Sequence, residues 1–465
     1  MSADADQRRT AQSVLFATVN SRASKVSQQH GSTRLHSFCN TKLQSWSSSS
    51  SNGKLEICIT TPPGQVEAGE LLMQCMYAAQ PDLSTCSQEQ LLQLLLLADS
   101  YGVPKVIGAA AAAFDSIVSA DLQWETVQAR YALPPGCAEL DACKPLFEAA
   151  GEKLQDELGD LELAWADASK QQLLLGLPQP ALLQLLQDDN TCVASENTVF
   201  FTISQWCRQQ QQPAQQQQQQ QQQEAVAMSA KHDLLKLVRM QHCTGLYATA
   251  VVARTRLAQS LFSAAEIAEA CVLASAGKRS QVAQTLLEHS PAVARFPAWK
   301  AAKRPASAMR QLDMQWQLPL QQLQEAVQQH LQHKLKMHYL LSTRHTWQGT
   351  CFMLKVEVTT DTAAPRTQLG LYIRMLDVPS GGVRSATYKL SIAAAPGSQA
   401  GNTKPDIELG PLTYTWTNEK GRGNNKLVTF DALSNWQQAE AKLRQLGLVH
   451  SDGCLHLRGL VTNIE

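Results

Sequence analysis

The sequence predicts an α+β protein in which helical segments come first and an antiparallel β-sandwich comes last. Three observations lead to this prediction. Apolar residues recur at helical spacing from Leu71 to Leu273, glutamine tracts interrupt that spacing at 209–223, and the pattern changes to strict alternation after His345. At 465 residues the chain has room for about three domains. We therefore expect several separately packed modules.

Residues 1–35 are basic, rich in serine and poor in acids, since no Asp or Glu occurs between Asp6 and Glu56. This composition predicts a disordered lead-in. It is also typical of organellar transit peptides, so an organellar location stays open beside the nucleus and the cytoplasm.

Residues 36–120 predict a small mixed domain. Leu55, Ile57 and Ile59 alternate with polar residues and indicate a strand. Ser87 and Gln90 have the spacing of a capping box, which opens a leucine-rich helix. That helix is apolar almost all round, so we expect it to be buried on several sides.

Residues 121–290 predict a helical domain. Ser195 is expected to cap a helix whose first turn holds Glu196, and Trp206 falls on its apolar stripe. A second capping box is expected where Ser263 precedes Glu266 by three residues. The glutamine tract at 209–223 has no means of burying apolar surface and predicts an exposed insertion between helices.

Residues 291–344 predict a basic linker and helix. Lys300, Lys303 and Arg304 form a short basic cluster that fits either a nuclear import signal or a solvated helix end. From Phe352 onward, alternating apolar runs separated by Gly, Pro and Asn predict the sandwich over 345–465.

Composition and motifs exclude several classes of function. Lys+Arg and Asp+Glu both number 40, so no net charge draws the chain to nucleic acid or to an anionic membrane. The 12 cysteines include no C-x-x-C pair, and no apolar run approaches the length of a membrane span. No motif predicts a catalytic residue, a cofactor or an enzyme. His330, His333 and His338 lack an acid or cysteine at metal-ligand spacing, so we predict no metal site.

The order of these segments resembles a known family. Residues 55–106 (LEICITTPPGQVEAGELLMQCMYAAQPDLSTCSQEQLLQLLLLADSYGVPKV) resemble the second half of a BTB domain. Residues 193–207 (VASENTVFFTISQWC) look like part of a BACK domain. The runs WQGTCFML, LGLYIRML and GCLHLRGL are similar to the TRAF/MATH-like sandwich of the plant light-response BTB proteins. The resemblance predicts an N-terminally degenerate BTB domain, an all-α BACK domain and a TRAF/MATH-like sandwich.

The resemblance implies a substrate-recruiting adaptor of a cullin-3 ubiquitin ligase, with a protein substrate, a homodimer and no cofactor. It places the cullin contact at Trp46, Ser48 and Tyr77, although cullin-binding relatives carry Glu where this chain has Ser48. Aromatic residues dominate interface hot spots, so Tyr372 and Trp347 are the predicted substrate contacts. Tyr372 is out of phase with the inward residues Leu371 and Ile373. The alternative is a scaffold that has lost cullin binding.

Overall fold

The predicted α+β fold is confirmed: after one short two-stranded sheet a helical region follows, and two antiparallel sheets come last. The chain divides into two compact units, Met1–Leu154 and Gln155–Glu465. The computed structural model describes residues 13–19, 55–61, 65–131, 133, 144–211, 229–276, 280–360, 366–376, 378, 382–396, 406–418, 420–431 and 433–465.

The first unit combines a two-stranded sheet with helices. The Ser87 hydroxyl accepts a hydrogen bond from the Gln90 backbone nitrogen, and the Gln90 side chain accepts one from the Ser87 backbone nitrogen, which confirms the predicted capping box of α3. The leucines of α3 are buried on several sides, because α2 and α4 both pack against it. The elements are β1 (Ser13–Val19), β2 (Leu55–Thr61), α2 (Val66–Tyr77), α3 (Gln88–Ser100), α4 (Pro104–Asp115), η2 (Ser119–Asp121), α5 (Trp124–Tyr131) and α6 (Lys144–Leu158).

The prediction of a disordered lead-in over 1–35 is wrong for residues 13–19. These residues form β1, which runs antiparallel to β2 with Ser13 opposite Thr61. The run SVLFATV is rich in apolar and β-branched residues, which favour strands. Composition averaged over the whole lead-in hides this short run, and its pairing partner is distant in sequence.

The second unit begins with short helices. The elements are α7 (Leu161–Ala166), α8 (Ala168–Gly176), α9 (Gln179–Gln187), α10 (Glu196–Gln211), η5 (Met240–His242), α12 (Gly245–Ala250), η6 (Val252–Arg254), α13 (Arg256–Gln259), α14 (Ala264–Ser275), α15 (Gln281–His289), α16 (Pro291–Arg295) and η7 (Pro297–Lys300). The capping box of Ser263 and Glu266 is confirmed at the start of α14. The glutamine tract continues α10 as far as Gln211, and the rest of it lies outside the described residues.

The start of α10 differs from the prediction. The Ser195 hydroxyl is buried and has no hydrogen-bond partner among the described residues, so Ser195 does not cap the helix through its side chain. Glu196 does lie in the first turn. Its carboxylate binds Arg304, which comes from a distant segment that a local capping pattern does not include.

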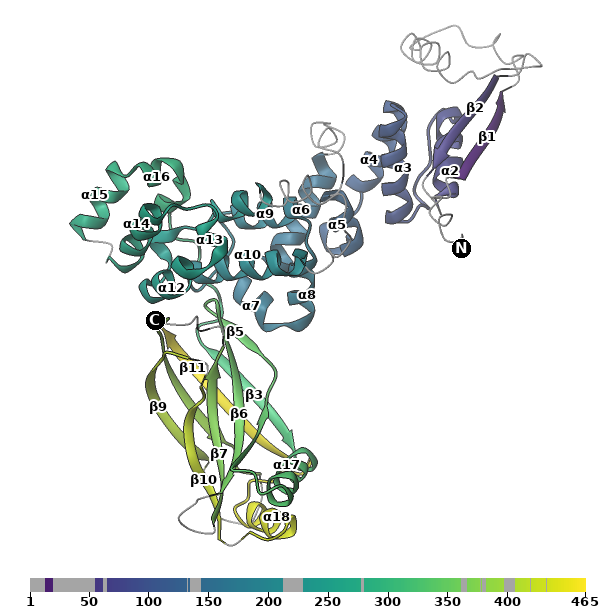
Figure 1. Cartoon of the computed structure of the whole chain (residues 1–465). Helices are drawn as coiled ribbons and strands as arrows, with labels where there is room; N and C mark the ends of the chain where they lie inside the picture. Colours follow the sequence, from purple (N-terminus) through teal and green to yellow (C-terminus); the bar gives the residue numbers. More distant parts are fainter. Residues whose placement is uncertain are drawn as a thin grey trace, which may run out of the picture. The chain divides into compact units, whose positions relative to one another are not determined.

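The end of the chain forms a sandwich of two antiparallel sheets (Figure 1). One sheet has the order β10-β7-β6-β4, with β5 also paired to β6, and the other has the order β3-β11-β8-β9. Inward residues of both sheets, such as Leu354, Ile373 and Leu390, share one core. The elements are β3 (Leu312–Pro319), α17 (Leu320–Gln332), β4 (Met337–Leu341), β5 (His345–Trp347), β6 (Thr350–Thr360), β7 (Arg366–Met375), β8 (Arg384–Ile392), β9 (Ile407–Trp416), β10 (Arg422–Asp431), α18 (Trp436–Gln445) and β11 (Cys454–Ile464).

The predicted boundary at 345 is wrong, because the sandwich already begins at Leu312. β3 pairs with β11 along its whole length, and β4 pairs with β6. Charge led to the assignment of 291–344 as a linker, but Leu312, Met314 and Leu318 alternate and are buried in the sandwich core.

In the part of the chain that the structure describes, no helix has both the length and the apolarity to cross a bilayer.

The predicted core position of Trp206 is confirmed. Its side chain is 6% exposed, and its indole Nε1 donates to the Leu177 carbonyl at 2.8 Å. We expect Trp206→Ala to lower the free energy of unfolding by about 3 to 5 kcal/mol, because it leaves a cavity and an unpaired carbonyl. Chemical denaturation followed by circular dichroism measures this loss. Leu163→Ala, at a side chain that is 45% exposed, is the control and should cost less than about 1 kcal/mol. Equal midpoints for the two variants would contradict the prediction.

Candidate protein-interaction site

The β5–β6 hairpin carries the sandwich onto the helices of the same unit (Figure 1). Trp347 pairs with Thr350 across a two-residue turn, and both turn residues are left-handed, with φ of 49° at Gln348 and 66° at Gly349. A turn with two positive φ values matches the twist of a hairpin and favours Asn-Gly sequences. This turn reaches the start of α10.

Only glycine fits at the tip of this hairpin. A Cβ built on Gly349 would lie 2.5 Å from the Asn197 carbonyl oxygen and 2.8 Å from its carbon. These are backbone atoms at the first turn of α10, so they cannot move aside as a flexible side chain would. The sandwich and α10 are therefore in direct backbone contact.

Glu162 of α7 is the central acceptor of this contact. Its carboxylate accepts from the backbone nitrogen of Gln348 at 3.0 Å, from that of Ala194 at 3.1 Å and from the Thr198 hydroxyl at 2.5 Å. The residue is fully buried. Burial raises the pKa of Glu162 to about 6, and these hydrogen bonds limit the rise. One buried carboxylate thus joins α7, α10 and the sandwich.

Asp160 makes a second connection next to it. It caps α7 through the backbone nitrogens of Glu162 and Leu163, and it also accepts from the Ser307 hydroxyl at 2.7 Å and the Ala308 backbone at 2.9 Å. The segment before β3 is in this way held against the start of α7.

Arg304 and Glu196 form a buried ion pair behind the same segment. Their side chains are each 1% exposed, and Arg304 Nε lies 2.9 Å from Glu196 Oε1. The guanidinium also donates to the carbonyls of Asp188 and Leu186, while the Arg239 backbone nitrogen donates to Glu196. Burial raises the pKa of Glu196, and the nearby charge of Arg304 opposes that rise.

The burial of Arg304 divides the basic cluster that the sequence indicated. Lys300 and Lys303 are exposed, whereas Arg304 is enclosed by protein. An import receptor would therefore reach two of these three cations. The cluster has a structural role at Arg304.

A further contact joins the sandwich to α12. The Arg384 guanidinium of β8 lies 4.7 Å from the centre of the Tyr247 ring and donates to Thr350. A cation over an aromatic face is attracted by the ring quadrupole, and the attraction is stronger when both groups are removed from water. Both side chains are buried here. The sandwich is therefore held at the hairpin, at the segment before β3 and at β8.

Residues 143–252 match the BACK family, described as "BTB And C-terminal Kelch". This match supports a BTB/BACK-type protein. The matched BACK segment contains Glu162, Glu196 and Tyr247, which are the helical partners in three of the contacts above. No curated protein matches the chain.

The predicted cullin contacts fall partly outside the structure. Trp46 and Ser48 lie outside the described residues. Tyr77 is the last residue of α2 and is 66% exposed, so it is available to a partner. Its role in binding stays a prediction.

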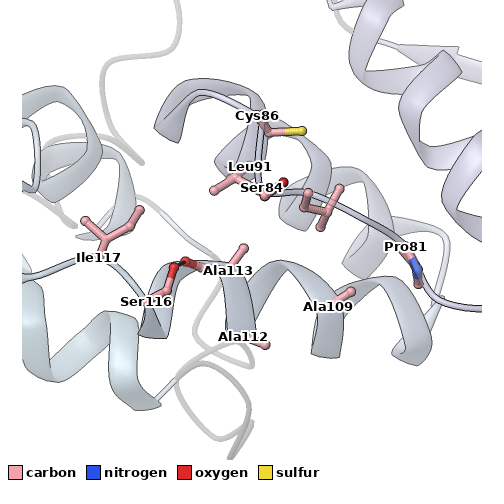
Figure 2. A pocket seen from close by; sticks show the side chains of 10 residues that line it. Pro81, Ser84, Cys86, Leu91, Ala109, Ala112, Ala113, Ser116 and Ile117 are labelled. Atoms are coloured by element: carbon pink, nitrogen blue, oxygen red, sulfur yellow. Dashed lines mark hydrogen bonds between the residues drawn. The ribbon is translucent and has the colours of Figure 1, made fainter.

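A groove of about 380 Å³ lies in the same unit as Tyr77. Figure 2 shows Ala109, Ala112 and Ala113 along one helix, α4, with Leu91 and Cys86 on the other side of the opening. The lining is largely apolar and small. Such a surface allows the backbone of a partner to approach closely.

The two predicted substrate contacts have different environments. Trp347 is 2% exposed and its indole donates to the Met309 carbonyl, so the assignment of Trp347 to a binding surface is wrong. Tyr372 is half-buried on the outer face of its sheet, as its strand phase predicted. Its hydroxyl is hydrogen-bonded to Glu357, and burial together with that carboxylate raises the pKa of the tyrosine.

The histidine cluster is divided among different environments. His330 is buried and its Nε2 lies 2.7 Å from the Thr360 hydroxyl, while His333 is the C-cap that follows α17. Within the described residues, no group of three His, Cys, Asp or Glu side chains is arranged to hold a metal ion.

Sequence reasoning missed the exposed apolar side chains of β4. Met337 is 46% exposed, Tyr339 47% and Leu341 36%. Their alternation is visible in the sequence, but the segment was assigned to the basic linker because of its charge. Sequence reasoning also missed Glu162 and Arg304 as contact residues, since nothing local identifies their distant partners.

We expect Gly349→Ala to loosen the contact between the hairpin and the BACK segment. The added methyl group meets the Asn197 backbone and also disfavours a positive φ, so the loss of stability should be about 1 to 3 kcal/mol. Gln348→Asn is the control at the neighbouring position, because Asn tolerates positive φ and keeps the backbone donor to Glu162. It should be neutral or slightly stabilising. Thermal unfolding compares the two variants with the parent. A Gly349→Ala variant as stable as the parent would disprove the contact between the hairpin and the Asn197 backbone.

Glu162 should make stability depend on pH. Its folded-state pKa is raised to about 6, so the folded protein binds this proton more tightly than the unfolded chain does. The stabilisation it contributes is fully present below the unfolded value of 4.5 and is lost as pH rises through about 6. We expect the unfolding free energy of the parent relative to Glu162→Gln to rise by up to about 2 kcal/mol as pH falls from 7 to 4.5. Denaturant titrations of the parent and of Glu162→Gln across this pH range test the prediction. A difference in unfolding free energy that stays constant or falls as pH is lowered would contradict it.

Proposed function

We propose that the chain is a substrate-recruiting adaptor of a cullin-3 ubiquitin ligase and acts by protein–protein interaction. The observation that carries this proposal is the BACK match at 143–252, followed by a sandwich that is held on the BACK segment by buried polar contacts. BTB/BACK-type proteins join partners, and a sandwich fixed on such helices can present a substrate in a defined direction.

The proposed mechanism is proximity. A substrate held near a ubiquitin-charged enzyme reacts as if the step were unimolecular, which lowers the entropic part of the barrier. For this the adaptor needs only oriented surfaces, and we propose that it carries out no covalent chemistry itself. In support, the buried carboxylates of Glu162 and Glu196 are engaged by hydrogen bonds and cations that join parts of the fold.

In this proposal, the N-terminal unit binds the cullin and the sandwich binds the substrate. Tyr77 and the groove beside α4 supply exposed surface in that unit. Tyr372 supplies a half-buried phenol on the outer face of the sandwich. The proposed homodimer would form through the BTB-like part.

The alternative is a scaffold that has lost cullin binding. Ser48 favours this alternative, because cullin-binding relatives carry a Glu at the matching position. The loss of a charge-assisted hydrogen bond weakens binding by about 1.5 to 3 kcal/mol, or roughly one to two decades of affinity.

A pull-down of the full chain with purified cullin-3 separates these two functions. We expect binding in the range of tens of micromolar, and Ser48→Glu should tighten it by roughly tenfold or more because it restores the acceptor. Ser50→Glu adds the same charge two residues further along and should have little effect. Absence of binding in both the parent and Ser48→Glu would discard the ligase function and favour the scaffold.

A further inference from the structure

Two histidines are stacked at the start of β11. The ring centres of His450 and His456 lie 3.7 Å apart, and the ring planes differ by only 7°. Both side chains are half-buried. His456 lies between the buried residues Leu455 and Leu457, so it points to the outer face of the sheet β3-β11-β8-β9. This is not the sheet that carries Tyr372.

A tight turn places the first histidine over the second. The His450 nitrogen donates to the Cys454 carbonyl at 3.0 Å, and the Gly453 nitrogen donates to the His450 carbonyl at 3.0 Å. Gly453 has a φ of 74°, which is the left-handed conformation that a short hairpin loop of this kind assigns to glycine. The backbone of residues 450–454 therefore fixes the stack.

Asp452 lies inside this turn and balances one positive charge on the histidine pair. Its Oδ2 lies 2.7 Å from His456 Nε2, and its Oδ1 accepts from the Cys454 backbone nitrogen at 2.9 Å. These two hydrogen bonds lower the pKa of Asp452, so the carboxylate stays ionised in mildly acidic solution. Partial burial and the same carboxylate raise the pKa of the Cys454 thiol, which is therefore neutral.

The histidine pair also holds the segment that follows β8. His450 Nε2 lies 3.2 Å from the Ala393 carbonyl oxygen, which only accepts, so Nε2 is the donor. The Ala393 nitrogen donates to the His456 carbonyl at 2.9 Å, and the Ala395 nitrogen donates to the Gly447 carbonyl at 2.7 Å. The turn and residues 393–395 are thus attached to each other through both histidines.

Other charged groups of the neighbouring elements have their own partners. Arg458 is paired with Asp313, Lys389 with Glu408 and Arg444 with Glu440. Asp406, which precedes β9, accepts from the Ala394 backbone nitrogen at 2.9 Å. Within the described part of the chain, Asp452 is the one carboxylate that is hydrogen-bonded to the histidine pair.

We propose that the turn at 450–454 is a proton-operated latch, which holds residues 393–395 while the two histidines share at most one positive charge and releases them when both rings are protonated. One charge is balanced by Asp452 and lies against the face of a neutral ring. A second proton places like charges in rings 3.7 Å apart, with one carboxylate to balance both. Imidazole in water has a pKa of about 6.5, so release belongs to the mildly acidic range.

Release of the latch changes the wall of a groove on the same face. This groove has a volume of about 430 Å³, and its lining includes Gln317, Ala393, His456 and Arg458. Ala393 and His456 belong both to the latch and to the groove. Protonation therefore couples to the shape of this surface. The latch is independent of cullin binding and of the substrate contact proposed at Tyr372.

Thermal unfolding of the full chain at pH 7 and at about pH 5 tests the charge argument with His450→Gln. The folded parent resists the second proton whereas its unfolded chain accepts it, so acid favours unfolding of the parent. His450→Gln has no second charge to place. On acidification we expect the melting temperature of the parent to fall by several degrees more than that of His450→Gln. The comparison cancels the contribution of other groups, such as Glu162, because both proteins carry them.

His289→Gln is the matched control, because it removes a histidine that is 74% exposed and also lies beside an acid, Glu288. It should follow the parent. Equal pH dependence of the parent and His450→Gln would overturn the proposal. If His450→Gln is unfolded at pH 7, His456→Gln provides the same comparison, since it also leaves one ring.

Hydrogen exchange followed by mass spectrometry locates the change. After correction for the intrinsic effect of pH, residues 393–395 and 447–456 of the parent should exchange roughly tenfold faster at about pH 5 than at pH 7, while β6 should not change. Asp452→Asn keeps an acceptor for Cys454 but removes the balancing charge, so release should move to higher pH. Faster exchange spread evenly over the sandwich would refute a local latch. The cullin pull-down at pH 7 should be the same for these variants, which separates this test from that of the adaptor function.

Discussion

The contact between Glu162 and the backbone of Gln348 is the constraint on which the architecture of the second unit depends. A buried carboxylate is costly unless its oxygens accept hydrogen bonds, and here the donors come from Thr198 of α10, from Ala194 in the segment before it and from the sandwich hairpin. If the hairpin moved away, the carboxylate would lose a donor in a place that water does not reach. The position of the sandwich on the BACK segment is therefore linked to the satisfaction of one buried charge.

The ion pair of Arg304 and Glu196 acts in the same way on the segment that leads into the sandwich. Removal of one partner from a buried pair leaves an uncompensated charge, which typically costs about 3 to 5 kcal/mol. Such pairs add little stability compared with apolar packing, and we propose that this one fixes the arrangement of BACK helices and sandwich. For the proposed adaptor, a single arrangement is the useful property.

The surfaces available to partners are separate from these buried contacts. Tyr77 and the groove beside α4 belong to the first unit, while Tyr372 and the apolar row of β4 (Met337, Tyr339 and Leu341) belong to the sandwich. Tyr77 and the β4 row are exposed, and Tyr372 is half-buried. Buried polar contacts fix the arrangement of the sandwich on the BACK segment, and aromatic or apolar groups at the surface are available to bind partners. This separation is expected of an interaction protein.

The sequence by itself determined the features that depend on near neighbours. The capping boxes at Ser87 and Ser263, the burial of Trp206 and the outward phase of Tyr372 all follow from spacings of a few residues, because helix and strand periods are local. Only the tertiary structure decided that Glu162 meets Gln348, 186 residues away, that Arg304 meets Glu196, 108 residues away, and that Trp347 is core. It also decided that β3 and β4 belong to the sandwich, since a strand is defined by a partner that the local pattern does not name.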